Sequence, residues 1–196
     1  MNLIQRGNAK LISQHMFNIT TSEAVCGRIC KGCYSAREQV RHPSALAVRD
    51  KRYEISLSSD FVSAMNVELK LLSSTEHKVL RLHSSGEFYS VEYINKWMQI
   101  FKANPEWTFY TFTKRFADFP TELKALDNLP NVYITDSLFA GTINYNKTGV
   151  VINPDTGVPL VVCPATLSKI GCDPDICKYC YSDNGSSIHG VAFKAH

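Results

Sequence analysis

The middle of the chain alternates short apolar runs, typical of β-strands, with amphipathic segments that have the spacing of α-helices. We predict strands at residues 53–57, 78–83, 107–113 and 131–137, and helices at residues 61–72, 91–102 and 121–126. Strands separated by helices are typical of parallel βαβ units. The pattern therefore predicts an α/β fold.

Two of these helices have clear spacing and end signals. Residues 58–60, Ser-Ser-Asp, predict an N-cap for a helix with apolar positions at Phe61, Met65, Leu69 and Leu72. The helix over 91–102 has its apolar residues at positions i, i+3, i+4 and i+7, and Pro105 ends it.

The pattern changes after residue 141. Apolar residues 150–153 and 158–163 flank a Pro-Asp-Thr-Gly turn and predict a β-hairpin. We predict a single domain over residues 1–196. Its three parts are a cluster-binding loop at 20–40, a βα core at 50–140, and the hairpin with a cysteine-rich lobe at 150–196.

Composition adds a few exclusions. The 196 residues are 44% hydrophobic, which suits one domain with a sizeable core. A formal charge of +3 is too small and too dispersed to indicate nucleic-acid binding. The sequence has no leader pattern and no apolar run of about 18 residues, so we expect no membrane span. We expect a cytoplasmic location, in a reducing compartment.

The seven cysteines cannot all pair as disulfides, and they fall into two groups near opposite ends of the chain. The first group is Cys26, Cys30 and Cys33, with the spacing C-x3-C-x2-C. Three thiolates this close suit one [4Fe-4S] cluster and leave one of its irons without a protein ligand. This spacing resembles the signature of radical S-adenosylmethionine (SAM) enzymes, although Gly32 precedes the last cysteine and the aromatic Tyr34 follows it. A zinc site completed by a distant residue, or three reduced thiols, is the alternative.

The second group is Cys163, Cys172, Cys177 and Cys180. Four thiolates can form a closed tetrahedral site for zinc or for a second iron–sulfur cluster. Because such a site leaves no position for substrate, we expect it to fold the tail, with electron transfer as the alternative.

Further candidates lie where the predicted strands end, which is where parallel sheets bind ligands. Radical SAM enzymes carry a Gly-Gly-Glu-like stretch after their second strand, and Ser85, Gly86 and Glu87 resemble it. Hydrogen bonding to solvent at a helix start would explain Glu87 equally well.

Other strand ends contribute charged and polar residues. Lys114, with Thr113 and Arg115, could bind a carboxylate or phosphate, and Asp136, with Ser137, a hydroxyl or amine. Solvated loop charges are the alternative explanation. His83 and His196 are candidate extra ligands or proton donors, although a lone histidine is more often structural.

The chain as a whole resembles a phage-encoded family named after gene product eighty-eight of a mycobacteriophage. The resemblance rests on both cysteine groups and on residues 7–11, 82–90, 93–97, 110–114 and 191–196. The family resembles reduced radical SAM proteins, which implies a partial (βα) parallel half-barrel, a phage origin and the host cytoplasm. It also implies SAM as ligand, with the amine of SAM held by the segment around Glu87.

Three functions follow from these observations. The first is a radical-SAM-type enzyme with an electron-donor protein as partner. The second is a non-catalytic iron–sulfur protein that senses redox state or binds a host protein, its first site closed by a histidine such as His83 or His196. The third is a zinc-stabilised interaction module.

Overall fold

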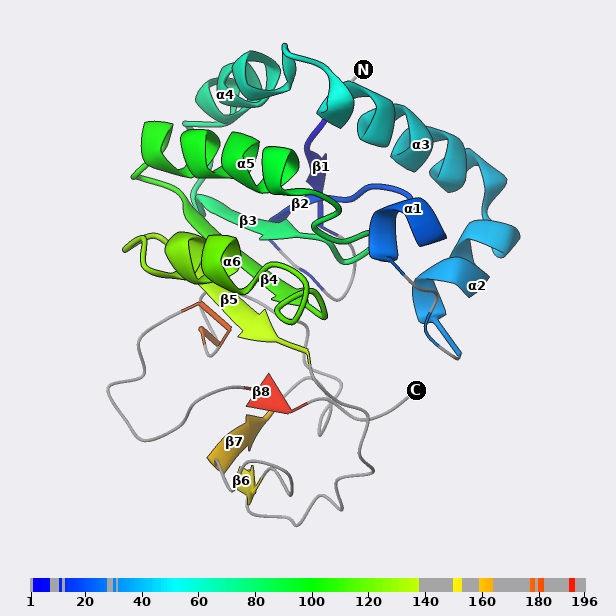
Figure 1. Ribbon diagram of the computed structural model, residues 1–196. Helices are drawn as coiled ribbons and strands as arrows, with labels where there is room; N and C mark the ends of the chain where they lie inside the picture. The colour runs from blue at the N-terminus through cyan, green and yellow to red at the C-terminus, as the bar shows by residue number, and fades with distance from the viewer. Residues whose placement is uncertain are drawn as a thin grey trace.

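A computed structural model shows a mixed α/β protein built around a five-stranded, mostly parallel sheet (Figure 1). The structure describes residues 2–7, 11, 13–27, 30, 32–137, 150–152, 159–163, 177–178, 180–181 and 191–192.

The strands of the main sheet follow one another in sequence order. They are β1 (Gln5–Arg6), β2 (His15–Phe17), β3 (Val79–Leu82), β4 (Thr108–Thr113) and β5 (Val132–Asp136). β1 pairs with β2 in antiparallel fashion, and the remaining neighbours are parallel. The carboxyl ends of β2 to β5 therefore meet at one edge of the sheet.

Helices connect the parallel strands. They are α1 (Glu23–Cys26), α2 (Tyr34–Arg41), α3 (Pro43–Leu57), α4 (Phe61–Leu71), α5 (Val91–Ala103) and α6 (Pro120–Asp127). The single connection from β2 to β3 contains α1 to α4, whereas α5 and α6 are the crossovers to β4 and β5. The cysteine loop and the helices that flank it thus belong to the connection between β2 and β3.

Most of the predicted elements in the core are confirmed. The strands predicted at 78–83, 107–113 and 131–137 correspond to β3, β4 and β5, and the helices predicted at 91–102 and 121–126 to α5 and α6. The predicted hairpin is also present, because β6 (Val150–Ile152) pairs in antiparallel fashion with β7 (Pro159–Val162).

The strand predicted at residues 53–57 is wrong, because these residues form the last turns of α3. Pro43 at the first turn begins that helix, and Arg52 and Ser56 lie buried four residues apart on one face. A run of five residues with β-strand preference is too short to end a helix that already extends over the ten residues before it. Asp60 lies at the predicted N-cap of α4, but its side chain makes no capping hydrogen bond.

The first parallel strand is instead β2, only three residues long, and all three of its side chains are buried. A run of His-Met-Phe gives neither the alternation nor the length that marks a strand in a sequence. Its neighbour β3 supplies the pairing that makes it a strand, with Phe17 opposite Leu82.

One hydrophobic core lies between the sheet and the helices that cover one of its faces (Figure 1). The helices contribute large aromatic side chains to it, among them Phe61, Tyr93 and Trp97, and these three are fully buried. Phe17 packs edge-on against Trp97 with ring centroids 5.2 Å apart. β2 is therefore packed against the helices through Phe17.

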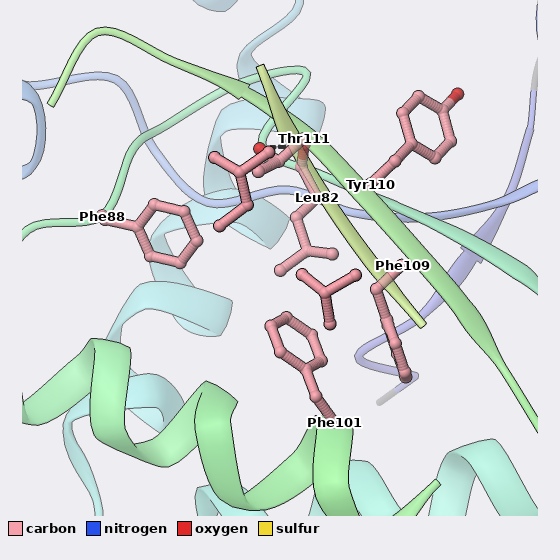
Figure 2. Close-up of a pocket in the computed structure, with 8 residues that line it drawn as sticks. Leu82, Phe88, Phe101, Phe109, Tyr110 and Thr111 are labelled. Carbon is pink, nitrogen blue, oxygen red and sulfur yellow. Dashed lines mark hydrogen bonds between the residues drawn. The ribbon is translucent and has the colours of Figure 1, made fainter. Parts of the chain in front are cut away.

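The pocket shown in Figure 2 belongs to this core. Phe101 of α5 and Phe88 converge there on Leu82 and Thr111 of the sheet, whereas Tyr110 points away to the other face. Its lining is apolar and it has no room for a water molecule. We therefore interpret it as a packing gap and not as a substrate site.

The opposite face of the sheet is covered in part by the C-terminal region. Tyr181 packs against Tyr110 with ring centroids 5.0 Å apart and, together with Val79, forms a second small apolar cluster. The guanidinium of Arg81 lies 5.5 Å from the centre of the Phe112 ring on this face. A second sheet, in the order β6-β7-β8, includes β8 (Val191–Ala192), which is parallel to β7.

No helix in the described part of the chain is both long and apolar enough to cross a bilayer.

The end of α3 is held by a lysine of α5. Lys96 Nζ donates to the carbonyl oxygens of Ser56, Leu57 and Ser58 at 3.0–3.1 Å and pairs with Glu92 at 3.0 Å. These carbonyls are at the helix C-terminus, where no further turn supplies N–H donors.

We expect Lys96→Met to lower the free energy of unfolding by about 2 kcal/mol, because the ammonium group is lost and several carbonyls lose their donor. Urea unfolding followed by far-UV circular dichroism measures the change. Lys102→Met is the matched control, since Lys102 is exposed on the same helix, and we expect it to change stability by less than about 0.5 kcal/mol. Equal stability of the two variants would contradict this account.

Candidate functional site

The first cysteine group lies at the carboxyl edge of the parallel strands. Cys26 ends α1, the short helix that follows β2, and Cys33 immediately precedes α2. Ser22 caps α1 by accepting a hydrogen bond from the backbone N–H of Val25 at 3.3 Å. The cysteine loop is therefore anchored at both ends by helices.

A glycine allows the chain to turn directly after Cys26. Gly27 has a φ of 71° and its backbone lies so close to Arg115 that a Cβ would be 1.7 Å from Nη1. Arg115 is itself held by Asp118, with 3.2 Å between Nε and Oδ2, and its guanidinium lies over the ring of Phe119. The loop after β4 is thus packed against the start of the cysteine loop.

The thiol of Cys26 is the most strongly affected by its surroundings. None of Cys26, Cys30 and Cys33 is in a disulfide, and each is partly exposed. Burial raises the pKa of the Cys26 thiol to about 11, with further contributions from the charges of Glu87, Cys33 and Cys30. Lys114 Nζ donates to Cys30 Sγ at 3.2 Å.

A preformed metal site needs several ligating side chains close together. Among the described residues, no three His, Cys, Asp or Glu side chains are grouped closely enough to hold a metal ion. Residues 28, 29 and 31 of the loop lie outside the described residues. Gly32 has a φ of 72° and no atom within 4 Å of the position of a Cβ, so its surroundings are open.

The donor set suits an iron–sulfur cluster in the kind of ligand that it offers. It consists of three thiols on one loop, next to two glycines with positive φ and beside a lysine ammonium. Thiolates are the ligands that iron–sulfur clusters require.

A buried group of hydroxyls joins the cysteine loop to the end of β3. Ser85 Oγ accepts from Ser35 Oγ at 2.6 Å and lies 3.2 Å from Thr21 Oγ1. The Ser85 backbone N–H donates to Asn18 Oδ1 at 3.1 Å. Gln39 of α2 completes the group, because its amide exchanges two hydrogen bonds with the backbone of Thr21.

Gly86 lets the segment after β3 approach the segment after β2. Its φ is +89°, and a Cβ there would lie 2.3 Å from Ile19 Cγ1 and 3.1 Å from the carbonyl oxygen of Ile19. Ser85 and Gly86, the first two residues of the predicted Ser-Gly-Glu stretch, therefore connect the loop after β3 to the loop after β2.

Glu87 connects the same segment to the end of β4. Its carboxylate accepts from Thr113 Oγ1 at 2.6 Å and from the backbone N–H of Lys114 at 3.2 Å. Burial raises the pKa of the Glu87 carboxyl, while these hydrogen bonds and the charges of Lys114 and Arg115 act in the opposite direction. The charge of Glu87 thus acts on the Cys26 thiol, while its carboxylate is bonded to the Lys114 backbone.

The structure places His83 in the aromatic core. Its ring lies 4.7 Å from that of Phe88, and Nε2 is 2.9 Å from the Tyr93 hydroxyl. Burial lowers the pKa of His83 to about 3, so the imidazole is neutral in the folded protein at neutral pH. These contacts describe a structural histidine.

The other predicted site residues are less informative. Tyr34 begins α2 and is 57% exposed. Asp136 pairs with Thr113 at the carboxyl end of β5, but its side chain lies outside the described part. His196 and Cys172 also lie outside the described residues.

The second cysteine group is described only in part. Cys163 follows β7, and Cys180 packs against the cluster of Val79, Tyr110 and Tyr181. The carbonyl oxygen of Cys177 accepts from the Tyr181 hydroxyl at 3.3 Å. The turn that carries Cys177 and Cys180 is therefore attached to the sheet face opposite the helices.

Thr21, Ser35, Gln39 and Asn18 were not predicted from the sequence. Scattered hydroxyl and amide residues have no periodicity, so their common role appears only when the loops are placed together. The one available signal is that Ser35 and Gln39 are four residues apart, a spacing that places them on one face of a helix.

The family model described as "Gene product 88" matches residues 2–148 of the chain. The chain therefore belongs to the Gene product 88 family. Membership confirms the resemblance to a phage gene product family found in the sequence. The matched part of this family member includes Cys26, Cys30, Cys33 and Glu87 and stops before Cys163. No curated protein and no solved structure matches the chain.

We expect Gly86→Ala to destabilise this Gene product 88 protein by about 3 kcal/mol, because strain at positive φ adds to a clash with Ile19. Gly32→Ala is the matched control. Gly32 has a similar φ but open surroundings, so we expect a loss of about 1 kcal/mol. Chemical denaturation of both variants tests the difference. An equal decrease in the free energy of unfolding of both variants would mean that the close contact between Gly86 and Ile19 does not contribute to stability.

Buried His83 predicts acid-sensitive stability. Its pKa is lower in the folded than in the unfolded chain, so the unfolded chain binds more protons between about pH 6.5 and pH 3. The contribution of His83 to the free energy of unfolding should be complete above about pH 6.5. As the pH decreases below about 6.5, the free energy of unfolding should decrease by up to about 1.4 kcal/mol per pH unit.

His83→Asn should remove this part of the pH dependence, because asparagine does not titrate and tolerates the φ of 56° at this position. We expect lower stability at pH 7 but a shallower decline from pH 6.5 to pH 4.5. Burial also lowers the pKa of His15. His15 should therefore contribute the same pH dependence of stability to the wild-type protein and to His83→Asn. Unfolding curves at several pH values provide the measurement, and parallel declines would contradict the assignment to His83.

Proposed function

We propose that this protein is an iron–sulfur protein of radical SAM type. Cys26, Cys30 and Cys33 would bind a [4Fe-4S] cluster. Such a cluster, held by three cysteines, supplies a one-electron donor and an iron at which SAM can chelate. The observation that carries the proposal is a short loop with three cysteines, closely spaced in the sequence, at the carboxyl edge of the parallel strands.

The topology supports this proposal. Strands β2, β3, β4 and β5 are adjacent in sequence order, and α4, α5 and α6 pack on the same face. Sheets of the doubly wound kind reverse direction at a switch point, whereas barrels of βα units continue in one direction. We therefore propose that the sheet corresponds to a truncated radical SAM half-barrel.

Side chains around the thiols would have separate tasks. Glu87, beside Cys26, would meet the amino group of SAM, and Lys114 would offer its ammonium to a carboxylate or thiolate. Ser85 and Gly86 would hold the loop that carries Glu87. Tyr34 and Asp136, at the edges of the site, are the remaining candidates for contact with SAM.

In this proposal the first site keeps one iron without a protein ligand. His83 is directed into the aromatic core and bonded to Tyr93, so it is not placed to close the first site. We propose that the second group, Cys163, Cys172, Cys177 and Cys180, binds zinc or a second cluster and folds the C-terminal lobe.

A non-catalytic role is the second candidate, and one observation favours it. Both carboxylate oxygens of Glu87 already accept hydrogen bonds within the chain. The protein would then use iron–sulfur or zinc sites to sense redox state or to bind a host protein.

Metal analysis separates these functions. We expect anaerobically reconstituted protein to contain about four irons and four sulfides at the first group. It should bind SAM in calorimetry and, with dithionite, release 5′-deoxyadenosine. Iron and sulfide without SAM binding would support the non-catalytic role, and zinc without sulfide would support the interaction module.

Two variants assign the metal to its ligands. Replacing Cys26, Cys30 and Cys33 together by alanine should remove this cluster and SAM binding. Cys177→Ala is the matched control in the second group, and it should lower metal content but preserve SAM binding. SAM binding that survives in the triple variant would overturn the proposed function.

A further inference from the structure

The loop after β4 presents two cations to the cysteine loop. Lys114 Nζ is 3.2 Å from Cys30 Sγ, and Arg115 lies against the backbone of Gly27, next to Cys26. Both come from one short segment between β4 and α6. Two positively charged side chains therefore lie on one side of the three-cysteine group.

The backbone position of Lys114 is fixed by neighbouring side chains. Its N–H donates to Glu87 Oε1, and Glu87 Oε2 is held by Thr113 Oγ1. The Arg115 N–H donates in turn to the same Thr113 hydroxyl at 3.1 Å. The side chain of Lys114 is exposed. It nevertheless extends toward Cys30 from a backbone position that hydrogen bonds fix.

We infer that Lys114 is a positioning and charge-balancing residue that raises the reduction potential of the group bound to Cys26, Cys30 and Cys33. This inference rests on the proposed function. Hydrogen bonds to cluster sulfurs, net charge and solvent exposure set the potential of iron–sulfur clusters. An ammonium beside a thiolate ligand favours the form that carries one more electron.

Glu87 has a second role in this arrangement. Its carboxylate adds negative charge beside Cys26 and at the same time holds the Lys114 backbone. Lys114 offsets that charge at the neighbouring cysteine.

The test compares Lys114→Met with Lys114→Arg and with Lys102→Met. The last variant removes the same charge from an exposed position at the end of α5. Each protein is reconstituted anaerobically, assayed for iron and sulfide, and equilibrated with dithionite and redox dyes. The reduced fraction is followed by electron paramagnetic resonance.

We expect Lys114→Met to lower the equilibrium constant for one-electron reduction about three- to tenfold. This corresponds to a potential about 30–60 mV more negative. Lys114→Arg and Lys102→Met should stay close to the wild-type value. The effect should shrink at high ionic strength, because exposed charges are screened by salt.

The outcomes distinguish this inference from the proposed function. Full iron and sulfide in every variant, with the same potential in Lys114→Met and Lys102→Met, would overturn the role of Lys114 alone. If Lys114→Met lost iron while Lys114→Arg and Lys102→Met retained it, the result would support the contact between Lys114 and the cluster ligand Cys30, because the positive charge would then be needed to bind the cluster. Wild-type protein without iron and sulfide would overturn the proposed function, and this inference with it.

Discussion

The arrangement of the site depends on the buried and partly buried hydrogen bonds among Thr21, Ser35 and Ser85. They join three segments that are far apart in the chain: the end of β2, the start of α2 and the turn after β3. Buried hydroxyls need partners, and each of these finds them in the other two segments. Because the cysteine loop leaves β2 and enters α2, both of its ends are held relative to the sheet.

This network works together with close backbone approach at two glycines. Gly86 brings the turn after β3 against Ile19, and Gly27 brings the cysteine loop against Arg115. Glu87 and Thr113 then link that turn to the end of β4. Three parallel strands thus contribute to one cluster of loops, which is the arrangement in which α/β proteins build ligand sites.

The C-terminal region adds a second attachment to the same sheet. Tyr181 covers Tyr110 on the face that the helices leave open, and Cys180 packs beside it. The two cysteine groups therefore have different surroundings. The first lies at the strand ends next to charged residues, and the second next to an apolar aromatic cluster.

Sequence patterns determined the βα core and the identity of the candidate ligands. The helical spacing of Ile94, Trp97 and Phe101, and the β-rich runs around Leu80 and Phe109, correspond to the α5, β3 and β4 of the structure. These signals are local, because each element shows its buried face in its own residues. The spacing of the cysteines likewise indicates a metal-binding loop without any structure.

Only the tertiary structure decided which segments form the rest of the fold and what surrounds the thiols. β2 is a strand because β3 pairs with it, and residues 53–57 are helical because α3 has already begun at Pro43. Lys114 reaches Cys30 across a separation of 84 residues. Such contacts leave no periodic trace in the sequence, since they depend on where distant strands end and not on the spacing of neighbouring residues.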